Sequence, residues 1–226
     1  LGGKNFSRMD SYDIGRVEVL RGPQGALHGR NALGGAINMI SKRPGDQFDV
    51  ELGYAAHISD ARDLSRYDIK MDVPMGGRFA ARIAHLREKY DKGYKRDING
   101  AYLDDDEYRL SRISLRYQPS DALAINYSFD MENSESYPAL SSRFGTEALR
   151  GFTRKNQNYF VNTRHTVDYD VDNHNLVVDY RLESGVFTSV TNVRTRKMIV
   201  FQDMDHTLAN ANVAATRQRM NYVDSR

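Results

Sequence analysis

The sequence contains no cysteine and no tryptophan, and it has only five prolines among its 226 residues. Without cysteine the chain forms no disulfide and offers no thiolate to a metal. No run of about 18 apolar residues occurs, so the chain is not a membrane protein built of spanning helices. The mean hydropathy of −0.65 is still compatible with a membrane barrel, because barrel strands alternate apolar and polar side chains.

The charges exclude another set of functions. Lys and Arg number 32 and Asp and Glu number 30, which leaves a formal net charge of +2, too small to indicate a nucleic-acid partner. The six histidines show no pair at the spacing of metal ligands, and neither G-x-S-x-G nor H-E-x-x-H occurs. We therefore expect no enzyme activity, no cofactor, no metal site and no nucleic-acid binding.

Glycine is concentrated in one segment, residues 16–44, which read RVEVLRGPQGALHGRNALGGAINMISKRP. Two strand-like runs, 16–21 and 35–40, flank a turn region that opens with Gly22 and Pro23, and Pro23 is placed to start a single helical turn. A nucleotide-binding loop is excluded because neither G-x-G-x-x-G nor G-x-x-x-x-G-K-[ST] is present. The turns are predicted to need the conformational freedom of five glycines, which are Gly22, Gly25, Gly29, Gly34 and Gly35.

After residue 44, apolar and polar residues alternate with a period of two, which is the signature of strands with one apolar face. The clearest case is 123–131, where Leu, Ile, Tyr, Phe and Met alternate with polar residues, whereas 79–88 and 187–201 follow the pattern less well. Together the alternation predicts about eight strands. They lie at 48–56, 67–73, 79–88, 112–117, 123–131, 175–182, 187–201 and 217–223.

The connections between these segments alternate in length. Short ones are predicted at 74–78, 119–122 and 183–186, and long polar ones at about 89–107, 133–172 and 202–216, with a shorter one at 57–64. Outer-membrane barrels have short periplasmic turns and long extracellular loops, so the chain is predicted to enter on the periplasmic side at Phe48. A soluble β-sandwich binding domain is the alternative, because strands with one apolar face also pack sheet against sheet.

Residues 16–44 resemble, in order and in spacing, the end of the plug domain of the TonB-dependent outer-membrane receptors. The resemblance implies a mainly β fold, in which the C-terminal part of a small α/β plug domain precedes a transmembrane antiparallel β-barrel. The barrel here would be partial, with about eight of the roughly 22 strands of such transporters. The plug part is placed at residues 1–45 and the barrel part at 46–226, and the sequence is expected to be an internal fragment of a longer receptor.

The resemblance also implies a function, which is active uptake of scarce nutrients such as iron–siderophore complexes, cobalamin or oligosaccharides into the periplasm. The implied partners are TonB with its inner-membrane energising complex, a siderophore or other large nutrient, and the lipid of the outer membrane. A truncated barrel that transports nothing is the alternative function.

Two sets of candidate site residues follow from the resemblance. Glu18, Arg21 and Arg30 are the candidates for ion pairs that dock the plug to the barrel wall, with a solvated position in the lumen as the alternative. The candidates for ligand contact are aromatic residues of the longest loop, where packing of the loop on itself is the alternative. They are Tyr137, Phe144, Phe152 and Tyr159.

Overall fold

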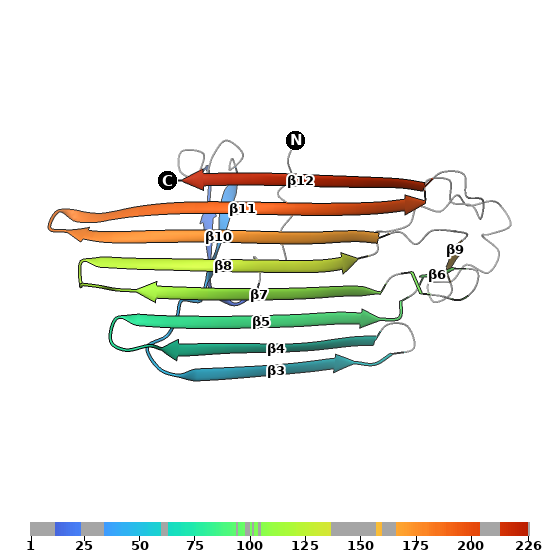
Figure 1. Ribbon diagram of the computed structural model, residues 1–226, viewed down its shortest axis with the longest axis horizontal. Helices are drawn as coiled ribbons and strands as arrows, with labels where there is room; N and C mark the ends of the chain where they lie inside the picture. The colour runs from blue at the N-terminus through green and yellow to red at the C-terminus, as the bar shows by residue number, and fades with distance from the viewer. Residues whose placement is uncertain are drawn as a thin grey trace.

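The structure of the protein is a computed structural model. Every regular element in the described part of the chain is a β-strand. Figure 1 shows a broad sheet with a separate two-stranded hairpin behind it. No helix among the described residues is long and apolar enough to cross a membrane. The described residues are 12–23, 34–59, 63–93, 95–97, 100, 102–103, 105–136, 157–159, 166–203 and 213–225.

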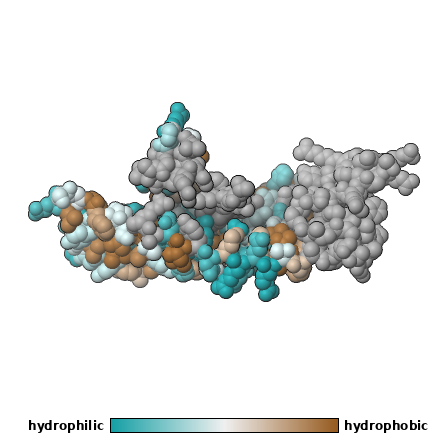
Figure 2. All heavy atoms as spheres, turned by 90° about the horizontal axis from the view of Figure 1, so that it is seen from above, coloured by the Kyte–Doolittle hydropathy of each residue, from teal (hydrophilic) through white to brown (hydrophobic). Residues whose placement is uncertain are grey.

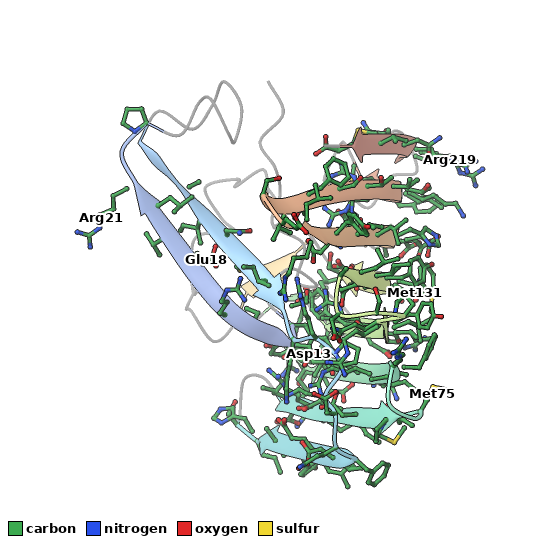
Figure 3. The ribbon with its side chains drawn as sticks, turned by 90° about the vertical axis from the view of Figure 1, so that its left-hand side faces the viewer. Asp13, Glu18, Arg21, Met75, Met131 and Arg219 are labelled. Carbon is green, nitrogen blue, oxygen red and sulfur yellow. The ribbon has the colours of Figure 1, made fainter. Side chains whose placement is uncertain are left out.

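The hairpin is formed by the glycine-rich segment. Strands β1 (Ile14–Arg21) and β2 (Gly35–Ser41) pair in antiparallel fashion, with Val19 opposite Ile37. Figure 3 shows the hairpin projecting from one face of the sheet, with its base beside the sheet and Arg21 near its far end. This side is called the inner face, and the opposite side the outer face.

Two of the predicted turn glycines have backbone conformations that L side chains rarely adopt. Gly22 has a φ of 86° and Gly35 a φ of 139°. A Cβ atom at Gly35 would also lie under 3.0 Å from the carbonyl oxygen of Leu20 on the partner strand, whereas a Cβ atom at Gly34 would meet nothing. Gly25, Gly29 and the helical turn expected after Pro23 lie outside the described residues.

The sheet contains eight strands, and each pairs in antiparallel fashion with its neighbour in the order β12-β11-β10-β8-β7-β5-β4-β3. This confirms the predicted fold class, and the β-sandwich alternative is wrong because these strands form a single sheet. The strands are β3 (Asp49–His57), β4 (Asp63–Pro74), β5 (Phe79–Asp91), β7 (Asp106–Tyr117), β8 (Leu123–Ser136), β10 (Thr166–Leu182), β11 (Gly185–Asp203) and β12 (Val213–Ser225).

Short connections join β4 to β5, β7 to β8 and β10 to β11, as predicted, and all three lie at one end of the sheet (Figure 1). The strand ends that the long connections join lie at the other end. Two of the long connections contain the short strands β6 (Lys95–Asp97) and β9 (Gln157–Tyr159), which pair in parallel fashion. Loops far apart in the sequence are therefore joined through their backbones.

Several strands extend beyond the segments that the alternation predicts. β8 runs to Ser136 and β10 starts at Thr166, so the connection between them is shorter than the predicted loop at 133–172. The pairing continues, with Asp168 opposite Glu135, although the outer-face side chains there are charged. Alternation of apolar and polar residues therefore marks only the apolar part of each strand, while backbone pairing extends the strand past it.

The outer face is apolar toward the short turns. Figure 2 shows the edge of the sheet at β12, with hydrophobic residues (brown) toward the turn end and hydrophilic residues (teal) further along. Met131 points away from the hairpin in Figure 3. Such exposed apolar side chains suit contact with lipid hydrocarbon. They include Val50, Leu52, Tyr54, Ile69, Ile83, Ile113, Met131, Leu176, Tyr180 and Leu182.

The inner face of β5 carries apolar residues as well, between the charged residues Arg82 and Glu88. Ala84 and Leu86 form a buried cluster with Leu110 of β7 and with Tyr12, which lies just before the hairpin. With apolar residues on both faces the period-two pattern is lost, which explains why 79–88 followed it poorly. The alanine leaves room for Tyr12 to approach the sheet closely.

We expect Gly35→Ala to destabilise the hairpin by about 1–3 kcal/mol, because the new methyl group needs a strained φ and meets the Leu20 carbonyl. Local opening should then expose the hairpin to trypsin roughly 5- to 150-fold faster. Gly34→Ala is the matched control, since it has open space and should cleave at the wild-type rate. Equal cleavage rates for the two variants would contradict this account of the turn.

Candidate functional site

Charged side chains are buried between the hairpin segment and the inner face of the sheet. Residues opposite one another in a ladder share a face, so Asp72 lies on the same face as Arg82, and Asp130 on the same face as Arg112. Because Arg82 contacts Asp13 and Arg112 contacts Tyr12, this is the face on which the hairpin lies. Ionised groups rarely lose contact with water unless they are paired. The buried polar and charged residues in the described part of the chain are Asp13, Asp72, Arg82, Glu88, Arg112, Ser114, Asp130, Glu132 and Asn173.

Arg82 of β5 joins the hairpin segment to the sheet. Its Nε and Nη2 atoms donate to the two carboxylate oxygens of Asp13 at 2.9 and 2.6 Å, and its Nη1 atom donates to Asp72 of β4 at 2.7 Å. The side chains of Arg82 and Asp13 are each only 2% exposed. The fork of donors on a guanidinium matches a carboxylate at two points, which makes this contact directional as well as strong.

The chain leaving the hairpin is fixed at the same place. The backbone N–H of Lys42 donates to the carbonyl oxygen of Asp13 at 2.9 Å, and the N–H of Gly45 donates to Asp72 at 3.0 Å. Asp46 contacts Arg116 of β7. Both ends of the hairpin therefore meet the sheet around Asp72 and Arg82, and this set of contacts is called the clamp. It comprises Asp13, Lys42, Gly45, Asp72 and Arg82.

A second buried arginine extends the contact across the sheet. Arg112 of β7 donates through Nη1 to the carbonyl oxygen of Tyr12 at 3.0 Å and through Nε to Asp130 of β8 at 2.5 Å. Asp130 also accepts from Asn173 of β10 at 2.9 Å, and Asn173 in turn accepts from Asn192 of β11 at 2.9 Å. One hydrogen-bonded network thus reaches from the hairpin segment to β11.

Tyr12 adds an apolar contact to these polar ones. Its ring lies in the cluster with Ala84 and Leu110, and among the described residues its hydroxyl has no hydrogen-bond partner. Burial raises the pKa of the Tyr12 phenol, and the nearby carboxylate of Asp68 acts in the same direction. The phenol is therefore neutral at physiological pH and serves as a packing group.

The structure places the predicted docking residues at different positions from the clamp. Glu18 accepts hydrogen bonds from Arg16 at 2.7 Å and Asn38 at 3.2 Å, all within the exposed hairpin. These bonds, first that from Arg16, lower the pKa of Glu18. Arg21 is exposed near the far end of the hairpin (Figure 3), and Arg30 lies outside the described residues. Docking roles for these three residues stay predictions.

The sequence analysis did not identify the clamp residues or the second contact at Arg112. Asp72, Arg112 and Asp130 fall at polar positions of predicted strands, where nothing distinguishes them from other polar residues. One signal was available at Arg82, whose inner-face neighbours two residues away on β5 are Ala80 and Ala84. Small residues on both sides of a long charged side chain let another segment approach the sheet closely enough to pair with that charge.

The predicted ligand-contact residues fall in the longest loop. Tyr137, Phe144 and Phe152 lie outside the described residues, and Tyr159 is the last residue of β9, so this role stays a prediction. On the inner face the structure brings together a different pair. The guanidinium of Arg196 on β11 lies 5.4 Å from the ring centre of Tyr169 on β10, toward the loop end of the sheet.

Known proteins resemble this chain in sequence. A family model described as the TonB-dependent Receptor Plug Domain matches residues 1–36. The pesticin receptor of Yersinia enterocolitica is 31% identical over 113 residues, which cover 48% of this chain and 16% of that protein. The ferrioxamine receptor of the same species is 25% identical over 177 residues, which cover 75% of this chain and 24% of that protein.

Solved structures show the same fold at lower sequence identity. The ferric yersiniabactin uptake receptor of Yersinia pestis matches with a TM-score of 0.72 and 19% identity, over 92% of this chain and 32% of that one. The open form of the ferric-catecholate import receptor of Escherichia coli K12 gives 0.65 and 17%, over 95% and 35%. The chain therefore spans about a third or less of the length of the proteins that it matches.

Removing one partner of the Asp13–Arg82 pair leaves a buried charge without its bidentate partner, so Asp13→Asn and Arg82→Gln should each destabilise the docked segment by about 3–5 kcal/mol. The double variant should lose less than the sum of the two. The measurement is the urea dependence of trypsin cleavage within the hairpin. Arg16→Gln, which removes an exposed side chain of the same hairpin, is the matched control and should leave the midpoint nearly unchanged. Additive losses would show that the two side chains act independently.

Arg112→Gln should weaken the docked segment by roughly 2–5 kcal/mol, because Asp130 loses its ion-pair partner and the Tyr12 carbonyl loses a donor. The control is Arg109→Gln on the same strand, where the arginine is exposed on the outer face and pairs with Glu107. The same urea titration should separate the two variants. If both shift the midpoint equally, the effect belongs to β7 in general rather than to the inner-face contact.

Proposed function

Because this chain belongs to the family of TonB-dependent outer-membrane receptors, we propose that it forms plug and barrel-wall segments of a receptor that imports ferric siderophores. In this proposal residues 1–45 belong to the plug and 46–226 to the barrel. The hairpin ends at Ser41 and the first wall strand begins at Asp49, which supports a boundary between them.

The observation that carries the proposal is the docking of the hairpin segment on the inner face of the wall. A passive channel needs an open lumen, whereas here Tyr12 and Asp13 are buried against β5 and β7. An obstructed lumen requires an external source of energy to open it, which supports TonB and its energising complex as partners. The exposed apolar side chains of the outer face support contact with the outer-membrane lipid.

The ligand class rests on the relatives and on the inner face. The relatives named above include receptors for ferrioxamine, ferric yersiniabactin and ferric catecholate. Arg196 and Tyr169 offer a cation and an aromatic ring on the inner face toward the loops, a combination that suits an anionic iron complex with aromatic groups. Tyr137, Phe144, Phe152 and Tyr159 remain proposed contacts for the same ligand. No residue is assigned a catalytic role.

The test is uptake of iron-55 as ferrioxamine, ferric yersiniabactin or ferric catecholate by cells that carry the full-length receptor. We expect accumulation of at least one complex in cells with TonB, and none in cells that lack either TonB or the receptor. Uptake that does not depend on TonB would contradict the proposal and indicate a passive pore. A receptor that takes up none of the three complexes would remove the siderophore assignment.

Arg196→Gln should weaken binding of the transported complex about 2- to 30-fold, which is the range for a lost cation–π or charge contact. Lys197→Gln is the matched control, because the adjacent side chain lies on the outer face and is exposed. The measurement is the concentration dependence of iron-55 binding to energy-depleted cells. Equal effects of the two substitutions would point to net charge rather than to a contact in the lumen.

A further inference from the structure

We propose that Lys197, Arg217 and Arg219, on the outer face of β11 and β12, bind a phosphate group of a phosphorylated lipid in the outer leaflet of the membrane. These three residues are called the cationic site. The inference rests on the proposed placement of residues 46–226 in the barrel wall. It goes beyond that proposal, because it assigns a lipid site on the face that does not meet the transported ligand.

The side chains of the cationic site come from two paired strands and lie on one face. Lys197 on β11 is directly opposite Arg219 on β12, and residues opposite one another in a ladder share a face. Arg217 is two residues from Arg219, which places it on that face as well. Figure 3 shows Arg219 pointing away from the hairpin, so this is the outer face. All three residues are exposed.

The charges of the cationic site are not neutralised within the described part of the chain, where none of the three residues takes part in an ion pair. Asp170 of β10 is opposite Lys197, but it accepts a hydrogen bond from Asn133 at 2.8 Å. Like charges directly opposite one another destabilise an antiparallel pair. An anion bound by both Lys197 and Arg219 would replace their repulsion with a shared contact.

The position of the cationic site along the strands suits contact with lipid headgroups. Val193 and Val223 are opposite one another on the same face, and both are exposed. Lys197 and Arg219 lie four residues from them toward the loops, roughly 10 Å higher for strands tilted by about 40°. Figure 2 shows the corresponding change from hydrophobic to hydrophilic side chains along this edge. Polar headgroups begin where the hydrocarbon ends, and long cationic side chains reach them readily.

Phosphate is the anion that matches these side chains. A guanidinium presents a planar fork of donors that binds two phosphate oxygens at once, and a lysine ammonium adds a point charge. The outer-face residues of the adjoining strands at this level include Glu135, Asp168 and Asp170, which repel phosphate. An anion is therefore confined to β11 and β12.

A lipid is favoured over a free anion as the source of this phosphate. Its acyl chains would contact the exposed apolar side chains nearer the turns, which holds its headgroup at the level of the cationic site. Clusters of Lys and Arg at the surface of a membrane attract anionic headgroups for the same reason. A free anion in solution gains no such anchoring.

Binding of lipid by the purified full-length receptor in detergent tests the proposal. The probe is diphosphoryl lipid A, and the comparison ligand is the same lipid after enzymatic removal of its phosphates. We expect Arg217→Gln/Arg219→Gln to weaken binding of the probe about 10- to 100-fold. The wild-type receptor should bind the dephosphorylated lipid as weakly as the variant binds the probe. Equal affinity of the wild-type receptor and the variant for the probe would overturn the proposal.

Two further variants separate a local contact from net charge and from misfolding. Arg78→Gln/Arg181→Gln removes the same charge from exposed arginines near the short turns, and it should bind the probe like the wild-type receptor. If this control pair loses as much affinity as the first variant, the effect is one of net charge and the proposal fails. Arg217→Lys/Arg219→Lys restores both charges without the forked donors, so its affinity should lie between those of the wild-type receptor and the glutamine variant.

Inorganic phosphate distinguishes a lipid site from a site for free anions. An equal concentration of inorganic phosphate should leave the probe bound, whereas displacement of the probe would overturn the lipid assignment. Iron-55 uptake is measured alongside. A receptor that imports iron but does not bind the probe would overturn this inference and leave the proposed function intact. A receptor that binds the probe through Arg217 and Arg219 but imports none of the three iron complexes would have the opposite meaning.

Discussion

Arg82 carries a full positive charge and is almost completely shielded from water. The way in which the hairpin segment and the sheet meet depends on neutralising this charge. The charge is tolerated because Asp72 lies opposite it on β4 and Asp13 approaches from the hairpin segment. Only one of these acids belongs to the sheet. The wall is therefore electrostatically incomplete until the hairpin segment is seated, which makes docking a condition of stability for β5 as well as for the hairpin.

The residues beside Arg82 are small, which allows the hairpin segment to pack closely against β5. Alanines at 80 and 84 keep the inner face of β5 low, so that Tyr12 and Asp13 come close enough for direct contact with the wall. Arg112 and its partners then carry the same polar network toward β11, whose Arg196 lies beside Tyr169 of β10 on the inner face nearer the loops. The surface proposed to meet the ligand and the surface that holds the plug thus lie on the same face of one sheet, and the hydrogen-bonded network of Arg112, Asp130 and Asn173 runs between them.

The two faces of the sheet follow different rules. On the outer face the exposed side chains near the turns are apolar and repeat every second residue, a pattern that suits contact with hydrocarbon. On the inner face the type of each side chain depends on the groups that it contacts, and these differ from strand to strand. This difference explains why apolar and polar residues alternate clearly in 123–131 but poorly in 79–88.

The sequence alone was sufficient for the strand-rich fold, the number of strands in the sheet, the short connections and the glycine requirement at Gly22 and Gly35, because period-two alternation and positive φ depend on local chemistry. The strand ends at Ser136 and Thr166 were not predictable, since backbone pairing there continues without an apolar face. The clamp was not predictable either. Asp13 and Arg82 are 69 residues apart, and a buried ion pair over that separation is decided only when the hairpin segment and β5 meet in the folded molecule.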